Sequence, residues 1–206
     1  MNFYERRILP HIINLGMRMP EIAARRATLI PGASGRVLEI GVGSGLNLPF
    51  YSAAAREIIG IEPSPRLLAM AQAAARRAPT SVPIDFRLGV SEALPLDSAS
   101  VDTVVTTWTL CTIPEVQKAL AEMRRVLKST GSLLFVEHGQ APDADVRRWQ
   151  DRINPVWKCL CGGCHLNRPI AALITGAGFQ MEHLDAGYMP KGPRFAGYMY
   201  QGRARP

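Results

Sequence analysis

The sequence has no apolar run long enough to cross a membrane, which takes about 18–20 residues. Near its start, the one apolar stretch is interrupted by Pro10, His11 and Asn14. A secretory signal peptide instead carries an unbroken apolar segment. We therefore expect neither a membrane-spanning helix nor a cleaved leader, and we predict a cytoplasmic protein.

Acidic residues are fewer than basic ones, 17 against 24, which gives a formal net charge of +7. Arginines such as Arg6, Arg25 and Arg76 are scattered along the chain, without a dense basic run or an RNA-binding aromatic motif. A basic surface indicates nucleic-acid binding mainly when its charges are clustered. We expect a solvated basic surface and no nucleic-acid partner.

Repeats, low-complexity tracts and interdomain linkers are also absent, and 206 residues suffice for one domain with a sizeable core. Strand-like segments alternate with helical ones over most of the chain, which predicts a doubly wound α/β sheet of parallel strands. The last two strands, residues 179–184 and 195–201, have no helix between them and should pair antiparallel. We predict a single domain, residues 1–206, with a helical cap over 1–30 and a core over 35–206.

Residues 1–30 carry apolar side chains at helical spacing from Tyr4 to Met19, with arginines on the other faces. This pattern predicts one or two amphipathic helices, broken near Pro10 or Pro20. Such helices can pack on the sheet, cover a substrate as a lid, or make a weak contact with a membrane surface. The sequence leaves these three roles open.

Three glycines at a spacing of two, Gly41, Gly43 and Gly45, follow a predicted buried strand. Glycine lacks a Cβ and adopts positive φ without strain, so such a turn brings the backbone close to a ligand. Residues 46–55 are expected to form a helix whose free N–H groups point back at the loop. A second strand then ends at Glu62, where a βαβ unit places the acid that binds a ribose. The pattern favours a nucleoside-containing cofactor over a plain strand-to-helix turn.

The dinucleotide fingerprint G-x-G-x-x-G is not met, because position 46 is leucine. The pattern E-x-G-x-G-x-G from Glu39 to Gly45 instead resembles the first motif of class I S-adenosylmethionine (SAM) methyltransferases. This resemblance implies that the glycine turn lies under the methionine part of SAM and that Glu62 binds the ribose hydroxyls. It also implies a Rossmann-like, seven-stranded, mostly parallel sheet whose antiparallel last strand inserts beside the fifth.

The stretch from Gly89 to Asp97 resembles the G-D-A-E-x-L-P segment of quinone-biosynthesis methyltransferases. In that segment an acid faces the adenine amino group, and the matching position here is Val90. The backbone around Ser91 or the carboxylate of Glu92 would replace this hydrogen bond. Glu92 is equally typical of a solvated helix start.

Thr107 and Trp108 follow the fourth predicted strand, and His138 follows the fifth. Ligands of doubly wound sheets bind beyond the carboxyl ends of the strands. We therefore expect Thr107 to contact SAM and Trp108 to line the boundary with the methyl acceptor, unless its ring lies in the core. His138 has an ordinary pKa suited to removing a proton from the acceptor near neutrality, and the alternative is a histidine that shapes the loop.

Three of the four cysteines lie in the segment Cys159–His165, which contains the haem-attachment pattern C-x-x-C-H. The same segment offers three cysteines and a histidine as zinc ligands. Four ligands within seven residues would make a cramped tetrahedron, and no second ligand pair lies elsewhere. We therefore predict neither haem nor a metal ion here, and ordinary thiols in a glycine turn.

The segments Leu110–Thr112, Glu137-His138 and Gly163–Arg168 resemble animal methyltransferase-like enzymes that methylate alkyl thiols. Those enzymes carry a hydrophobic N-terminal membrane anchor, to which the resemblance does not extend. The prediction is a SAM-dependent methyltransferase for a small, apolar or amphiphilic acceptor: an alkyl thiol, a quinol-type phenol or a phospholipid amine. A non-catalytic SAM-binding scaffold with the same fold is the alternative from another class, and the sequence does not indicate an oligomeric state.

Overall fold

The computed structural model describes residues 3–78 and 82–206, and its centre is one sheet. The strands are β1 (Gly35–Ile40), β2 (Ala55–Glu62), β3 (Ile84–Leu88), β4 (Val101–Thr107), β5 (Leu127–His138), β6 (Gln180–Tyr188) and β7 (Tyr198–Arg205). Their spatial order is β3-β2-β1-β4-β5-β7-β6. The first five strands pair in parallel, and β7 pairs antiparallel with both β5 and β6. The predicted sheet is confirmed, including the insertion of the seventh strand beside the fifth.

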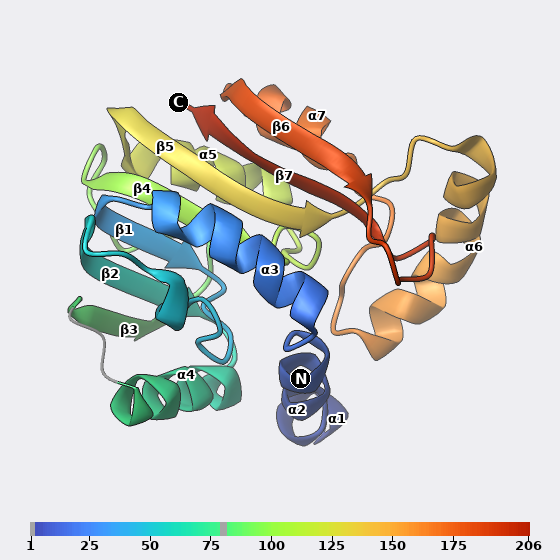
Figure 1. The fold of residues 1–206 in the computed structure, drawn as a ribbon, viewed down its shortest axis with the longest axis horizontal. Helices are drawn as coiled ribbons and strands as arrows, with labels where there is room; N and C mark the ends of the chain where they lie inside the picture. Colours follow the sequence, from blue (N-terminus) through green and yellow to red (C-terminus); the bar gives the residue numbers. More distant parts are fainter. Residues whose placement is uncertain (1–2, 79–81) are drawn as a thin grey trace.

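Helices lie on both faces of this sheet. They are α1 (Phe3–Arg7), α2 (Leu9–Gly16), α3 (Pro20–Leu29), α4 (Pro65–Arg77), α5 (Val116–Val126), α6 (Ala144–Leu160) and α7 (Ile170–Gly176), with the 3₁₀ turns η1 (Ile30–Gly32) and η2 (Leu48–Phe50). In Figure 1, α3 crosses the front of the sheet, α5 and α7 lie behind it, and α6 lies beyond the ends of β5 and β7. One apolar cluster joins the sheet to α5 and α7, and a second joins the opposite face to α3 and η1.

The N-terminal segment forms three helices rather than the one or two expected. Pro10 and Pro20 both lie in the first turn of a helix, where a missing N–H costs nothing. Several apolar side chains remain exposed there, including Phe3 at 73%, Ile12 at 52% and Leu15 at 74%. Within the described ranges, no helix combines the length and apolar character that a membrane crossing requires. The weak membrane contact of this segment stays a prediction.

Helix starts were predicted less well than strands. Ser64 before Pro65 has the sequence of a helix start, and its Oγ accepts a hydrogen bond from the Leu67 N–H at the start of α4. Residues 112–115 have the sequence of a capping box, but α5 begins at Val116 without a side-chain cap. Asn167, a residue type that favours helix starts, does not cap α7, because its Nδ2 donates to Asp151.

The helix expected over residues 46–55 is also absent. Only the turn η2 forms, followed by extended backbone at Tyr51. Pro49 removes one backbone donor within this segment, and the side chains of Asn47 and Tyr51 turn inward to hydrogen-bond Glu39. The segment therefore anchors the loop through side chains rather than through a helix.

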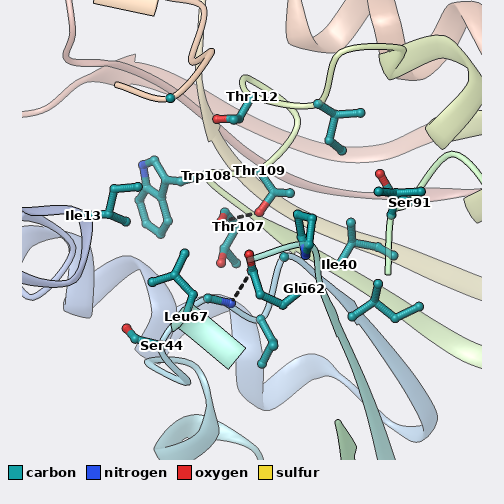
Figure 2. Close-up of a pocket in the computed structure, with 18 of the residues that line it drawn as sticks. Ile13, Ile40, Ser44, Glu62, Leu67, Ser91, Thr107, Trp108, Thr109 and Thr112 are labelled. Carbon is teal, nitrogen blue, oxygen red and sulfur yellow. Dashed lines mark hydrogen bonds between the residues drawn. The ribbon is translucent and has the colours of Figure 1, made fainter. Parts of the chain in front are cut away.

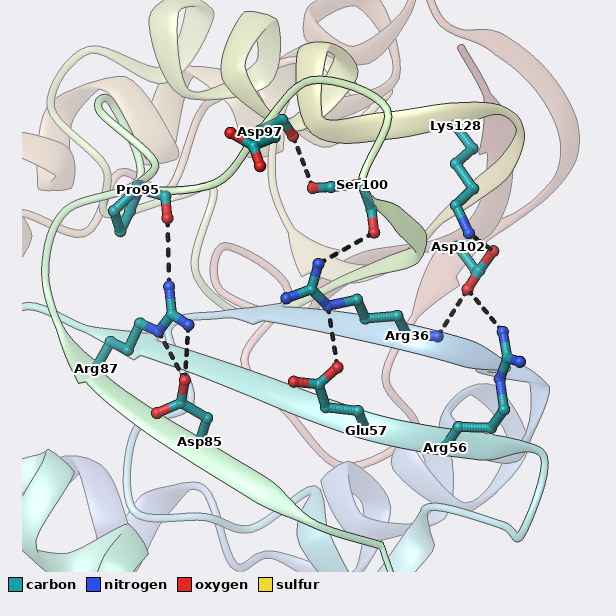
Figure 3. Close-up of polar contacts among 10 residues, drawn as sticks. All are labelled: Arg36, Arg56, Glu57, Asp85, Arg87, Pro95, Asp97, Ser100, Asp102 and Lys128. Carbon is teal, nitrogen blue, oxygen red and sulfur yellow. Dashed lines mark hydrogen bonds and ion pairs between the residues drawn. The ribbon is translucent and has the colours of Figure 1, made fainter.

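At the amino-terminal ends of the strands, Asp102 of β4 contacts residues of β1, β2 and β5 (Figure 3). Its carboxylate accepts from the Arg36 backbone N–H at 2.8 Å, from Lys128 Nζ at 2.7 Å and from Arg56 Nη2 at 3.4 Å. Arg36 also pairs with Glu57 at 3.0 Å. These partly exposed charges lie at one end of the strands, which leaves the carboxyl ends free to carry the site.

Candidate active site

A cavity of about 420 Å³ opens at the carboxyl ends of β1, β2 and β4 (Figure 2). Its volume lies in the range of about 300–1,000 Å³ that is common for small-molecule sites. The walls come from the glycine loop, the end of β2, the turn after β3, the residues after β4 and helix α2. Among its lining residues are Ile13, Met17, Arg26, Gly41, Gly43, Asn47, Glu62, Ser91, Glu92, Thr107, Trp108, Thr112, Ile113 and Gly162.

Seven of the predicted site residues line this cavity and three do not. Those that line it are Gly41, Gly43, Glu62, Ser91, Glu92, Thr107 and Trp108. Glu39 lies behind the glycine loop, Gly45 packs against α4, and His138 lies in a separate cluster with two cysteines.

The glycine loop presents its backbone to the cavity at Gly43. This residue has φ of +57°, and a Cβ built on it would find only the Gly41 carbonyl oxygen, at 3.8 Å. The open space on that side lets a ligand approach the main chain. Gly45 serves packing instead, because a Cβ there would lie 3.1 Å from the Ala71 Cα.

Glu62 ties the glycine loop to the end of β2. Its Oε2 accepts from the Gly43 N–H at 3.0 Å and its Oε1 from the Ser64 N–H at 2.9 Å. Burial raises the pKa of this carboxyl, and the two backbone donors oppose that rise. Each oxygen keeps a second lone pair, so the group can accept further hydrogen bonds from ligand hydroxyls.

Behind the loop, Glu39 organises a buried polar network. Its carboxylate accepts from Asn47 Nδ2 at 2.8 Å and from the Tyr51 hydroxyl at 2.7 Å. Burial raises the pKa of Glu39 to about 7, although these hydrogen bonds and the nearby Arg26 guanidinium lower it in part. Glu39 therefore positions the loop from behind and is not among the residues that line the cavity, and its role in holding the cofactor stays a prediction.

Ser91 and Glu92 lie together in the turn after β3. The Ser91 hydroxyl donates to Glu92 Oε2 at 3.1 Å, and Glu92 Oε1 accepts from the Glu115 N–H at 3.4 Å. No helix begins at Glu92, so the helix-start interpretation is wrong. The pair connects the cavity wall to the start of α5.

Trp108 lies at the cavity wall in a strained backbone conformation, with φ of +50°. Its backbone N–H donates to the Val136 carbonyl at 2.8 Å. The Arg26 guanidinium stacks on the indole ring, 4.9 Å from the ring centre. Ile13 of α2 and the Trp108 ring both line the cavity, and Figure 2 draws them near each other. Trp108 also packs against the apolar cluster beneath α3, so its ring lies partly in the core, and its place beside the methyl acceptor stays a prediction.

His138 is buried at the end of β5, with Nε2 3.0 Å from the Cys164 Sγ. The Cys164 Sγ is in turn 3.6 Å from the Cys111 Sγ. Burial alone would lower the pKa of His138, but the contact with Cys164 raises it above its usual value. The proton-acceptor role of His138 stays a prediction, to which the composition of the cavity wall adds no support.

Sequence reasoning missed Arg26, Asn47, Ile13 of α2 and Met17, which directly follows α2. Arg26 is only 4% exposed, and its guanidinium donates to Asn47 Oδ1 at 2.9 Å and to the Met17 carbonyl at 2.8 Å. A polar residue two positions after the last glycine was the available signal for Asn47. Nothing in the pattern of scattered arginines distinguishes Arg26.

Comparisons with known proteins agree with this geometry. A family model described as a methyltransferase domain matches residues 38–135. Human thiol S-methyltransferase TMT1B is 33% identical over 180 residues, which cover 82% of this chain and 72% of that protein. Phosphatidylethanolamine N-methyltransferase of Cereibacter sphaeroides is 32% identical, over 55% of this chain and 56% of its own length. The crystal structure of a SAM-dependent methyltransferase from Thermotoga maritima, described as a possible histamine N-methyltransferase, superposes with a TM-score of 0.70. It is 21% identical and covers 98% of this chain and 97% of that one.

Proposed function

Because the chain belongs to the family of SAM-dependent methyltransferases that includes TMT1B, we propose that it methylates the sulfur of a small, apolar thiol. The thiol methyltransferase relative aligns with more of this chain than the lipid-amine relative does, 82% against 55%. The observation that carries the proposal is the division of the cavity between a polar end and an apolar wall.

The polar end fits the cofactor SAM. Glu62 would accept the ribose hydroxyls with the lone pairs that Gly43 and Ser64 leave free. The open backbone at Gly43 would lie against the methionine part, as the family motif implies. Ser91 and Glu92 would face the adenine from the turn after β3, and Thr107 would contact the cofactor from the end of β4.

The apolar wall fits an uncharged acceptor. Ile13, Met17, Trp108 and Ile113 line it with hydrocarbon and aromatic surface. Burying an alkyl chain against such a wall contributes about 0.8 kcal/mol per methylene. A lipid amine would instead bring a positive charge to a wall that carries the Arg26 guanidinium.

The sulfonium of SAM supplies an activated methyl group. Transfer to a thiol would return the electrons of the sulfonium–methyl bond to the sulfonium sulfur, so that the cofactor leaves as a neutral thioether, and the thiol proton would pass to water. The task of the protein is alignment, because an in-line displacement needs the two sulfurs held on opposite sides of the methyl group. Trp108, Ile13 of α2 and Met17, which follows α2, would exclude water from this line.

The test is a methyl-transfer assay with radiolabelled SAM and linear alkanethiols of increasing length, compared with matched alkylphenols and alkylamines. We expect transfer to the thiols, with kcat/KM rising about fourfold per added methylene until the wall is filled. Trp108→Ala should raise KM for the longer thiols and leave SAM affinity unchanged. Transfer to the phenols or amines without transfer to any thiol would overturn the choice of acceptor.

A further inference from the structure

Three soft or borderline metal donors meet inside the protein although they are far apart in sequence. Cys111 follows β4, His138 ends β5, and Cys164 follows α6. Their donor atoms all lie within 4.8 Å of one another. None of the three is more than 9% exposed. Only Cys164 of this set lies in the segment Cys159–His165, for which the sequence predicts no metal ion.

Two of the three donor separations are close to the edges of a zinc tetrahedron, and the third is at most 4.8 Å. With Zn–S bonds of about 2.3 Å and Zn–N bonds of about 2.0–2.1 Å, the S···S edge is about 3.8 Å and the S···N edge about 3.6 Å. The observed Cys111–Cys164 separation is 3.6 Å and the His138–Cys164 separation is 3.0 Å. The histidine would need to withdraw by roughly half an ångström, which is a small adjustment for a ring at the end of a strand.

The ligand set also neutralises the ion. Zn²⁺ binds two thiolates and a neutral imidazole, so binding releases one proton from each of the two thiols, and the occupied site carries no net charge.

We infer that Cys111, His138 and Cys164 form a zinc-binding site with a Cys₂His ligand set and one open position. Thiolate and imidazole ligands in a tetrahedral arrangement are typical of Zn²⁺. The ion would join the loop after β4, the end of β5 and the loop after α6. Thr112 and Gly162, close neighbours of Cys111 and Cys164 in the chain, line the cavity, so the site lies in the wall next to it. This inference does not depend on the identity of the methyl acceptor.

The test loads the reduced full-length protein with Zn²⁺ and with Co²⁺, removes free ions by gel filtration, and measures bound metal by elemental analysis. We expect about one ion per chain, two protons released per ion, and thiolate-to-cobalt charge-transfer bands. Cys111→Ser and Cys164→Ser should each weaken binding by about 100-fold or more, since even partners of metal ligands contribute 10–100-fold. Cys159→Ser is the matched control, because that cysteine is exposed and outside the cluster.

Reduced wild-type protein that retains no ion would overturn the inference, and so would wild-type affinity in Cys111→Ser. Equal loss in Cys159→Ser would assign the ion to the Cys159–His165 segment instead, which also overturns it. If the serine variants fail to fold by circular dichroism, the cobalt spectrum of the wild-type protein decides, because bands without thiolate character contradict the proposed ligands. None of these readouts requires methyl transfer, so they are separate from the test of the proposed function.

Discussion

Replacing Glu62 with glutamine tests the assignment of the cofactor end of the cavity. The carboxylate accepts from the Gly43 N–H at 3.0 Å and from the Ser64 N–H at 2.9 Å. Glutamine has the same size, but its NH₂ end cannot accept, so one of these two donors loses its partner. The hydroxyls of the ribose lose a charge-assisted acceptor as well.

A hydrogen bond to a charged group contributes about 1.5–3 kcal/mol, so SAM affinity should fall by about 10- to 150-fold in Glu62→Gln. Isothermal titration calorimetry with SAM measures this, after circular dichroism has shown that the variant is folded. Glu57→Gln is the control, because Glu57 lies on the same strand but pairs with Arg36 at the opposite edge of the sheet.

The same assignment has a pH dependence. Burial raises the pKa of Glu62, and the ionised carboxylate is the form that accepts both hydroxyls. Wild-type affinity for SAM should therefore decline as the pH is lowered through that pKa, whereas the affinity of Glu62→Gln should not change for this reason. Unchanged affinity in a folded Glu62→Gln, together with an unaltered pH profile, would refute the role of Glu62.

Three further predictions concern stability and the loop. Burial raises the pKa of Glu137 from 4.5 to about 7, so the folded protein holds this proton more tightly than the unfolded chain does. The free energy of unfolding should therefore fall by about 3 kcal/mol as the pH rises between these two values. Glu137→Gln should abolish that decline in urea titrations at pH 5 and pH 8. Gly43→Ala and Gly178→Ala should each cost about 1–2 kcal/mol, because both positions have positive φ, but only Gly43→Ala should weaken SAM binding in calorimetry. Arg26→Met should destabilise the protein by about 2–3 kcal/mol in urea, since Asn47 Oδ1 loses its donor, and an unchanged midpoint would contradict that.

Local signals predicted the elements that depend on neighbouring residues. Ser64 before Pro65 marked the start of α4, and the alternation of strands and helices indicated the parallel sheet. The region after the glycine loop was harder, because its apolar residues suit a helix as well as a turn. Which of the two forms is decided by Glu39, whose buried carboxylate needs the side chains of Asn47 and Tyr51 as donors. That requirement is tertiary and has no local pattern.

The same reasoning explains why the wall beside Trp108 was missed. Arg26 contacts Met17, Asn47 and Trp108 at once, which joins the N-terminal helices, the glycine loop and the end of β4. Burial lowers the pKa of its guanidinium to about 10, so it stays charged at neutral pH and must keep these partners. In the sequence it is one of many arginines, all compatible with a solvated surface. A buried charge becomes recognisable only when the elements around it are known, and here those elements are also the ones that enclose the cavity.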